Sequence, residues 1–342
     1  MSVVVTGATG FVGRTLVAAL RARGLTVRAL VRPGSPASAR DRLRSLGAVL
    51  AEGDVSDEGS LKAAMRGAGV VFHCASAGVR ATADESERVN LVGTENALSA
   101  ARASGARRFV HLSTEAVTRG HDARSYVDES FPQPPGFLDF SAQTKALAED
   151  LVVAASGDGI ETVALRPALL WGVDDTVTLP RLGRAVREGK FWWVNHGRSL
   201  IATTYVSNLV DAMIAASEAP DAGSKVYYVT DDERVTYREF VTLYLKTVGL
   251  TPPGRSAPYH LAYLYAWWCE RTQDEPVVIR SEVAQTGLSS HFNVQRARKE
   301  LDWSPEVSIA EGMKAVTAWV RSRGADDVLG AEVTPSLTAP AG

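Results

Sequence analysis

The sequence predicts an α/β protein in which a doubly wound parallel β-sheet carries a smaller lobe at its C-terminal end. Short β-branched runs alternate with helical patterns through the first half of the 342 residues. A glycine-rich loop follows the first of these runs directly. After Arg166 and Pro167 the alternation stops, and helices mix with short extended pieces and proline-rich joints.

The predicted strands are short runs rich in valine, and each one after the first follows a predicted helix. They cover residues 2–6, 26–31, 48–51, 70–74, 108–112 and 162–165. The spacing of apolar residues predicts helices over residues 11–23, 38–46, 60–66, 85–104 and 141–156. We expect βαβ units in a domain of residues 1–165, and a lobe of residues 166–325 that is partly interleaved with the sheet. The small residues of 326–342 predict a disordered, functionally silent tail.

Composition argues against several classes of function. The chain is 45% hydrophobic with a net charge of −2, and it has no long basic block, so we expect no nucleic-acid partner. Apolar stretches stay well below the roughly 20 residues of a membrane span. Cys74 and Cys269 lack metal-type spacing. We expect a cytoplasmic protein with no structural disulfide.

The segment TGATGFVG places Gly7, Gly10 and Gly13 between a predicted strand and a predicted helix. Glycine tolerates a turn with positive φ and lets a diphosphate approach the backbone closely. The free N–H groups at the start of the helix then attract the phosphates. This context is the fingerprint of a Rossmann domain that binds a nicotinamide dinucleotide. The neighbouring residues Thr9, Phe11 and Val12 belong to the same predicted site.

The end of the second predicted strand bears on the choice of coenzyme. An acidic residue about 20 positions after the glycines usually binds the ribose of NAD. Here the strand ends at Arg32 without an acid, and Arg28 is nearby, so a 2′-phosphate could be gripped instead. We therefore favour NADP(H), while NAD(H) stays possible if Arg32 is only a solvated loop residue. Asp54 and Val55, after the third strand, are expected at the adenine.

These motifs together resemble the extended short-chain dehydrogenases/reductases, and within them the branch related to 3β-hydroxysteroid dehydrogenase and dihydroflavonol reductase. The resemblance covers residues 1 to about 324. Its motifs are TGATGFVG, GDVSD, VFHCAS, RVNLVGTENALSAA, RFVHLSTEAV, TKALAED, LRPALLWG and FNVQRARKELDWSP.

The resemblance implies hydride transfer between a nicotinamide and a carbon that bears an alcohol or ketone. Thr114 stands where a Ser or Thr orients the substrate oxygen, and Lys145 stands where a Lys binds the nicotinamide ribose and lowers the pKa of a Tyr. Ala75 and Ser76 are expected along the coenzyme, and Pro167 near the nicotinamide. The resemblance also implies that Asn90 supports the active-site backbone, although a helix-surface Asn is the alternative. A homodimer through the 85–104 and 141–156 helices is implied as well.

The position four residues before Lys145 departs from the family, because it is Ser141 rather than Tyr. A serine hydroxyl is far less acidic than a phenol of pKa ~10, and its side chain is a ring shorter. Ser141 could hold a water that relays the proton, Tyr126 could reach the site, or the substrate could need no enzymic acid. Two further hypotheses stay open: a non-redox isomerase, dehydratase or cyclase, and a catalytically silent binding protein.

Aromatic residues in the predicted lobe suggest an apolar pocket for a ring-shaped or prenylated substrate. They are Phe191, Trp192, Trp193, Tyr263, Tyr265, Trp267 and Trp268. The alternatives are that these side chains pack in the core, or that residues 260–269 lie on a membrane surface. His73, His111 and His196 are interpreted as structural. The sequence thus predicts an NADP(H)-dependent oxidoreductase acting on a hydrophobic, cyclic small molecule.

Overall fold

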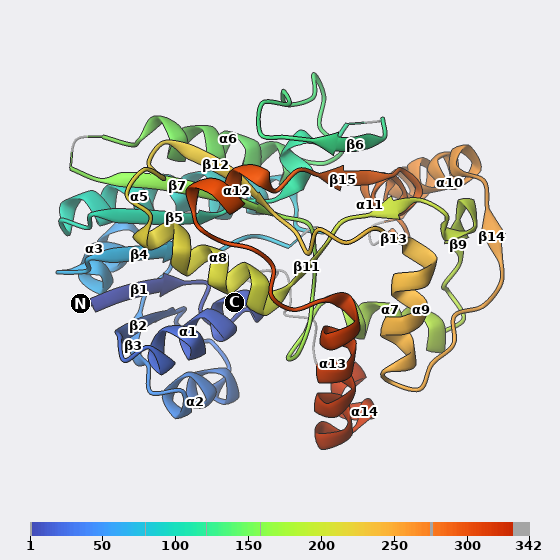
Figure 1. Cartoon of the computed structure of the whole chain (residues 1–342), viewed down its shortest axis with the longest axis horizontal. Coiled ribbons are helices and arrows are strands. Elements are labelled where there is room, and N and C mark those ends of the chain that lie inside the picture. The colour runs from blue at the N-terminus through green and yellow to red at the C-terminus, as the bar shows by residue number, and fades with distance from the viewer. Residues whose placement is uncertain (1, 79, 121, 158, 274–275, 331–342) are drawn as a thin grey trace.

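A seven-stranded sheet, in which every neighbouring pair of strands is parallel, forms the centre of the protein in this computed structural model (Figure 1). The structure describes residues 2–78, 80–120, 122–157, 159–273 and 276–330. In spatial order the strands are β3 (Val49–Glu52), β2 (Thr26–Val31), β1 (Ser2–Thr6), β4 (Val70–His73), β5 (Arg108–Leu112), β7 (Glu161–Pro167) and β12 (Lys225–Val229). The predicted doubly wound α/β fold is confirmed.

The strand order reverses between β1 and β4, because β2 and β3 extend the sheet to one side and the later strands extend it to the other. In such sheets ligands bind outside the carboxyl ends of the strands at this reversal. The loops after Thr6 and His73 therefore flank the expected binding crevice.

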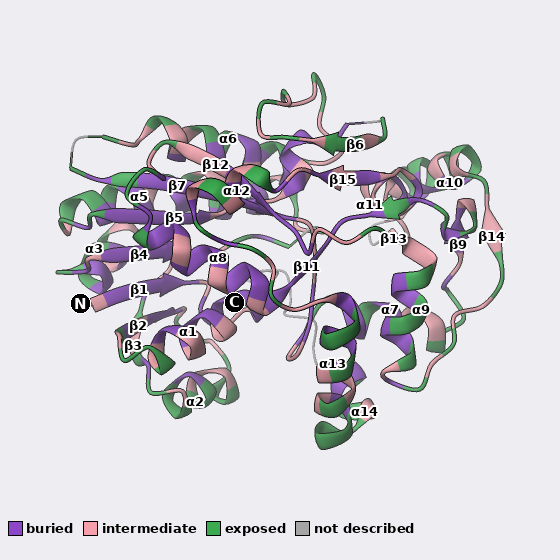
Figure 2. Cartoon of the chain, viewed as in Figure 1, coloured by how far each residue is buried: buried purple, intermediate pink, exposed green. Residues whose placement is uncertain are grey.

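Helices cover both faces of the sheet. One face is packed by α1 (Phe11–Ala22), α2 (Ala37–Ser45) and α8 (Val206–Glu218), and the other by α3 (Glu58–Met65), α5 (Gly93–Ala103) and α6 (Phe140–Ala154). Side chains of a strand alternate between faces, so Val3 and Val5 join the first core while Val4 joins the second. Figure 2 shows the strands buried between these layers.

The helix predicted over residues 85–104 is not regular. It consists of α4 (Ala83–Ser86), a π-helical segment η1 (Glu87–Val92) and then α5. Such wide turns are often found at functional sites. Here the π segment contains Asn90, which is buried rather than on the helix surface.

The smaller lobe is built from short strands, which pair two by two, and from seven helices among the described residues. The strands are β6 (Arg124–Val127), β8 (Leu169–Trp171), β9 (Trp193–Val194), β10 (Leu200–Ile201), β11 (Thr203–Tyr205), β13 (Val235–Thr236), β14 (Ser256–Ala257) and β15 (Ser290–Phe292). The α-helices are α7 (Thr178–Arg187), α9 (Tyr237–Lys246), α10 (Tyr259–Thr272), α11 (Arg280–Gly287), α12 (Gln295–Glu300), α13 (Ile309–Arg323) and α14 (Ala325–Gly330). The described residues also include two 3₁₀ turns, η2 (Glu115–Thr118) and η3 (Asn195–Gly197). A separate core around Trp171, Phe240 and Tyr244 packs α7, α9, α13 and α14 together, whereas α12 packs into the core of the sheet.

The tail predicted to be disordered begins as a helix, so that prediction was wrong for its first residues. Helix α14 packs on α7, and both Val328 and Leu329 are buried. A Cβ on Gly183 would lie 2.4 Å from Leu329 Cδ2, which shows how closely the two helices approach. Residues 331–342 lie outside the described part of the chain.

Within the described residues, no helix has both the length and the apolar character needed to cross a membrane.

Candidate active site

The glycine loop lies at the reversal of the sheet and leaves no room for side chains. Gly7 has a φ of +63°, and a Cβ there would stand 2.6 Å from the carbonyl of Cys74 after β4. A Cβ on Gly13 would lie 2.2 Å from the Gly7 carbonyl oxygen. Gly10 caps α1 without a side chain, and its N–H donates to the Gly7 carbonyl over 3.0 Å. The first N–H groups of α1 thus remain available to an anion, as phosphates require.

The residues next to the glycines anchor the start of α1. Phe11 and Val12 are buried, so their side chains hold the helix against the sheet while their backbones stay at its N-terminus. The Thr9 carbonyl accepts a 2.5 Å hydrogen bond from Arg14. Arg14 also pairs with Asp174 of the smaller lobe at 3.4 Å. This pair connects the predicted coenzyme loop to the lobe.

The two arginines of the second strand have different environments. Arg28 donates to Ser2 Oγ and to the carbonyls of Ala64 and Arg66, so it holds the amino-terminal edge of the sheet together. The suggestion that Arg28 assists in phosphate binding was therefore wrong. Arg32 follows β2 at the carboxyl edge, is half-buried, and makes no hydrogen bond or ion pair with side chains in the described part of the chain.

The other residues predicted to contact the coenzyme follow β3 and β4, at the same edge of the sheet. Asp54 accepts hydrogen bonds at Oδ1 from the N–H and the hydroxyl of Ser56, at 2.9 and 2.7 Å, while Val55 is buried. The backbone of Ala75 is held by Thr6 Oγ1 at 3.2 Å. Ser76 is exposed.

Asn90 fastens the loop after β4 to the helix that carries Lys145. Its Oδ1 accepts the Ala77 N–H at 2.9 Å and the Ser76 hydroxyl at 3.3 Å. Its Nδ2 donates to Thr144 Oγ1 at 3.0 Å. The side chain therefore supports the active-site backbone, as the resemblance implied, and the alternative of a surface Asn is excluded.

Thr114 and Lys145 come from two neighbouring elements of the same edge. Thr114 follows β5 and caps η2, where its Oγ1 accepts the Ala116 N–H at 3.3 Å. Ser141 and Lys145 both lie on α6, one turn apart, so they share a helix face. Ser141 is buried and carries no ring.

Lys145 lies in a poorly solvated environment. Burial lowers the pKa of its ammonium group to about 8, because the charged form loses hydration, and nearby Cys74 and Glu149 only partly oppose this. The same burial raises the pKa of the Cys74 thiol. An ammonium with a pKa near 8 can release a proton close to neutral pH, which an ordinary lysine cannot.

A buried polar network that sequence reasoning missed connects the two elements that carry the predicted catalytic residues. Glu149 accepts hydrogen bonds from the Ser113 hydroxyl at 2.6 Å and from Arg166 Nη2 at 2.5 Å. Arg166 also contacts the Tyr228 hydroxyl at 3.4 Å. Because Ser113 precedes Thr114 and Glu149 lies one turn after Lys145, the network fixes their relative positions. The four-residue spacing between Lys145 and Glu149 was the sequence signal that could have indicated this network.

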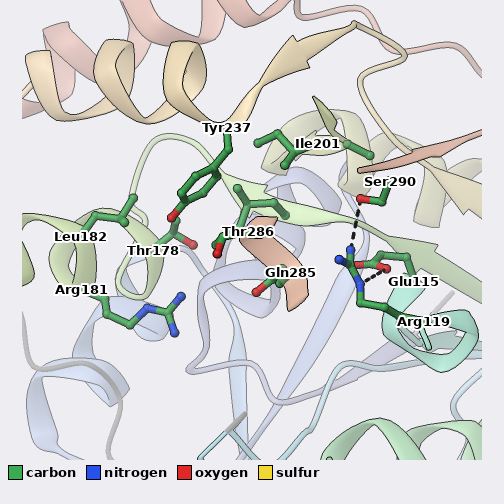
Figure 3. A pocket seen from close by; sticks show the side chains of 12 residues that line it. Glu115, Arg119, Thr178, Arg181, Leu182, Ile201, Tyr237, Gln285, Thr286 and Ser290 are labelled. Carbon is green, nitrogen blue, oxygen red and sulfur yellow. Dashed lines mark hydrogen bonds and ion pairs between the residues drawn. The ribbon is translucent and has the colours of Figure 1, made fainter. Parts of the chain in front are cut away.

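Next to Glu115, the residue after Thr114, the structure forms a pocket that is lined mostly by residues of the smaller lobe (Figure 3). Its lining mixes apolar and charged side chains. They are Glu115, Arg119, Leu169, Thr178, Arg181, Leu182, Ile201, Ala202, Tyr237, Gln285, Thr286 and Ser290. Burial raises the pKa of Tyr237 to about 12, so this phenol stays protonated. Sequence reasoning missed the lining residues, because they converge from seven elements that are far apart in the sequence.

The aromatic residues predicted to wall a pocket lie elsewhere, so that expectation was wrong. Phe191 and Trp193 are buried in the core of the lobe, as the alternative proposed. Tyr265, Trp267 and Trp268 are exposed on α10. Tyr126 lies on β6 with its ring stacked on His291, and within the described part of the chain no hydrogen bond joins it to Ser141 or Lys145.

The histidines fit structural roles. His73 is buried between Thr6 Oγ1 at 2.9 Å and Thr94 Oγ1 at 3.1 Å, and burial lowers its pKa to about 3. Its ring stacks on that of His111. No group of side chains suited to a metal ion occurs among the described residues.

Comparisons with known proteins agree with this geometry. The sequence model of the 3-beta hydroxysteroid dehydrogenase/isomerase family matches residues 4–259. A 4-hydroxy-2-methyl-3-oxo-4-farnesyl-3,4-dihydroquinoline-1-oxide ketoreductase from Stigmatella aurantiaca is 38% identical, over 92% of this chain and 96% of its own. A 2-alkyl-3-oxoalkanoate reductase from Stenotrophomonas maltophilia is 33% identical, over 93% of this chain and 99% of its own.

Among solved structures, MoeE5 in complex with UDP-glucuronic acid and NAD has the same fold. Its TM-score is 0.71 at 26% identity, over 94% of this chain and 99% of that one.

Proposed function

This chain belongs to the 3-beta hydroxysteroid dehydrogenase/isomerase family, and on that premise we propose that it is an NADP(H)-preferring ketoreductase for hydrophobic, cyclic ketones. Its type is an NAD(P)-dependent oxidoreductase on an extended short-chain dehydrogenase/reductase scaffold. One observation carries the proposal. Thr114 follows β5 and caps η2, which packs against α6, the helix that carries Lys145. Glu115, the residue after Thr114, lines a pocket with apolar walls.

The residues present fit a dinucleotide. Gly7 and Gly13 of the cradle leave no space for a Cβ, and the uncapped start of α1 after Gly10 offers N–H groups to a diphosphate. Thr9, Phe11, Val12, Ala75, Ser76 and Pro167 would line the remainder through their backbones, with Asp54 and Val55 at the adenine. Lys145 would bind the nicotinamide ribose. When bound, the reduced coenzyme supplies a hydride.

Arg32 supports a preference for the phosphorylated coenzyme. It stands at the carboxyl edge of β2 with its guanidinium not engaged by described side chains, so it can pair with a 2′-phosphate. Isothermal titration calorimetry should show NADPH binding more tightly than NADH. R32A should remove most of that difference, and an unchanged difference would exclude Arg32 from coenzyme selection.

Reduction of a ketone requires a proton at the oxygen as the carbon gains a hydride. We place the Thr114 hydroxyl as hydrogen-bond donor to that oxygen. The proton comes from the Lys145 ammonium, whose pKa of about 8 suits this role, and it passes through a water that Ser141 holds one helical turn away. After transfer, the solvent restores the proton on Lys145.

The substrate class follows from the pocket and from the relatives. Leu169, Leu182, Ile201 and Ala202 give it apolar walls, which suit a hydrocarbon ring or chain. One relative is described as acting on a farnesylated cyclic ketone and another on an alkylated oxoalkanoate. Both substrates combine a ketone with a hydrocarbon chain, and we extend this combination to the present chain.

The experiment is NADPH oxidation with 2-decylcyclohexanone, followed by absorbance of the reduced coenzyme and mass spectrometry of the product. We expect one alcohol per coenzyme oxidised, and loss of turnover in T114A. Turnover of a substrate with no net coenzyme oxidation would indicate isomerisation, dehydration or cyclisation instead. If both the parent and S141Y are inert with coenzyme bound, a silent binding protein is indicated.

A further inference from the structure

One corner of the pocket is charged, although the pocket otherwise suits a hydrocarbon. Arg119 lies there, at the C-terminal end of η2, with only 7% of its surface exposed. Its Nε donates to Glu115 Oε2 at 3.1 Å, and its Nη2 donates to Glu115 Oε1 at 2.6 Å and to Ser290 Oγ at 3.2 Å. The guanidinium is therefore fixed in orientation before any ligand arrives.

The remaining terminal nitrogen, Nη1, makes no hydrogen bond with the residues that the structure describes. Figure 3 shows the guanidinium at the edge of the pocket, with Gln285 and Thr286 across the space from it. Arginine cannot lose its proton in a protein, so this group always offers N–H donors to the pocket. A poorly solvated donor with a full charge favours an anionic acceptor.

The charges around the pocket leave an excess of one positive charge. Glu115 neutralises Arg119. Arg181, which also lines the pocket, shares the single carboxylate of Glu282 with Arg80, at 2.8 and 2.9 Å. A ligand with one negative charge would restore neutrality.

The position of Arg119 relates this charge to the reacting carbon. Glu115 directly follows Thr114, and consecutive Cα atoms lie about 3.8 Å apart. Arg119 folds back onto Glu115 across one 3₁₀ turn. Thr114 is the N-cap and Arg119 the C-cap of this turn, so one short segment would hold both an oxygen bound at Arg119 and a carbonyl bound at Thr114.

We propose that Arg119 binds a negatively charged oxygen of the substrate, a carboxylate or enolate close to the ketone, and selects ketones that carry such a group. The inference rests on the proposed ketone reduction and names the class of ketone. Glu115 acts as a positioning residue that orients the guanidinium and moderates its charge. The pocket thus binds an amphiphilic substrate, with the acidic head at Arg119 and the hydrocarbon body along Leu182 and Ile201.

A matched pair of ligands tests the assignment without turnover. The ketones 3-oxododecanoate and 2-undecanone share one chain and differ by the carboxylate. Calorimetry on the protein saturated with NADP⁺ should show the carboxylate binding at least about 10-fold more tightly. R119Q should lose about 10- to 100-fold for 3-oxododecanoate and less than about 3-fold for 2-undecanone.

Three further variants separate recognition from support of the fold. E115Q keeps Arg119 but removes the competing carboxylate, so it should tighten 3-oxododecanoate binding several-fold. If the pair only held η2 in place, E115Q would weaken both ligands equally. The double variant E115Q/R119Q avoids an unpaired buried charge and should behave as R119Q. R187Q removes an equal charge from the exposed side of α7, where Arg187 pairs with Asp326, and should change neither ligand.

The assignment is overturned if R119Q and E115Q/R119Q keep the preference for the carboxylate, or if R181Q abolishes it instead. Turnover is measured separately with NADPH. A preference that depends on Arg119 in a protein that oxidises no NADPH would refute ketone reduction while leaving the anion site established. Reduction of 2-undecanone without any preference would refute only the anion site.

Discussion

Proton supply from Lys145 predicts an unusual dependence of ketone reduction on pH. The pKa of this ammonium lies at about 8, against 10.5 for a solvated lysine. The protonated fraction therefore falls from about nine-tenths at pH 7 to about one-tenth at pH 9. Above pH 8, kcat/KM for reduction should drop roughly tenfold per pH unit.

The sign of the effect reverses for alcohol oxidation, because neutral Lys145 is then the required form. Activity in that direction should rise with pH and level off above about 8. Stopped-flow rates with saturating NADPH, together with the coenzyme Kd at each pH, separate the proton step from coenzyme binding. K145R should be slow and almost independent of pH between 7 and 9.5, since arginine stays charged.

A flat profile from pH 7 to 9.5 in the parent protein would refute Lys145 as the proton source. A slope that persists in K145R would refute it as well, because arginine stays charged and Tyr237, with a pKa of about 12, stays protonated over this range.

Three further changes test other parts of the structure. G13A should reduce coenzyme affinity by at least about 10-fold in calorimetry, because its Cβ would lie 2.2 Å from the Gly7 oxygen; parent-like affinity would show that the loop is not the cradle described. E149Q should lower the free energy of unfolding by about 3–5 kcal/mol in urea titrations, since Arg166 keeps a buried charge, and E149Q/R166M should recover a good part of this loss. If the double variant is as unstable as the single one, the cost does not come from the unpaired charge. L329A should cost about 2–5 kcal/mol through the cavity left against Gly183, whereas a cost below 0.5 kcal/mol would mean that α14 does not pack on α7 in solution.

The central sheet was predictable because its signals are local. The alternation of β-branched runs with amphipathic helices placed β1, β2 and β5 at their observed bounds. The glycine spacing fixed the turn before α1, where a Cβ would collide with neighbouring backbone. Such patterns depend on a few adjacent residues, so they can be read without knowing the tertiary structure.

The rest required contacts that adjacent residues do not reveal. The π-helical segment around Asn90 was predicted as part of one regular helix, and its hydrogen bonds to Ala77 and Thr144 join residues that lie far apart in the sequence. Arg28 lies on β2 and Arg32 directly follows it, but the first is near the amino-terminal edge of the sheet and the second at the carboxyl edge.

The pocket is the clearest case. Its walls come from helices and strands far apart in the sequence. The aromatic residues that were expected to form a pocket wall instead lie exposed on α10. Aromatic content alone does not distinguish a pocket wall from a core or an exposed helix face.

The most direct measurement is isotope transfer. Purified protein is incubated with 2-decylcyclohexanone and NADPH that carries deuterium at C4 of the nicotinamide, and the product is examined by mass spectrometry. An alcohol with a single deuterium on the carbon that bore the oxygen is the expected product. A product without deuterium, formed while the coenzyme stays reduced, would contradict the assignment of this site to ketone reduction.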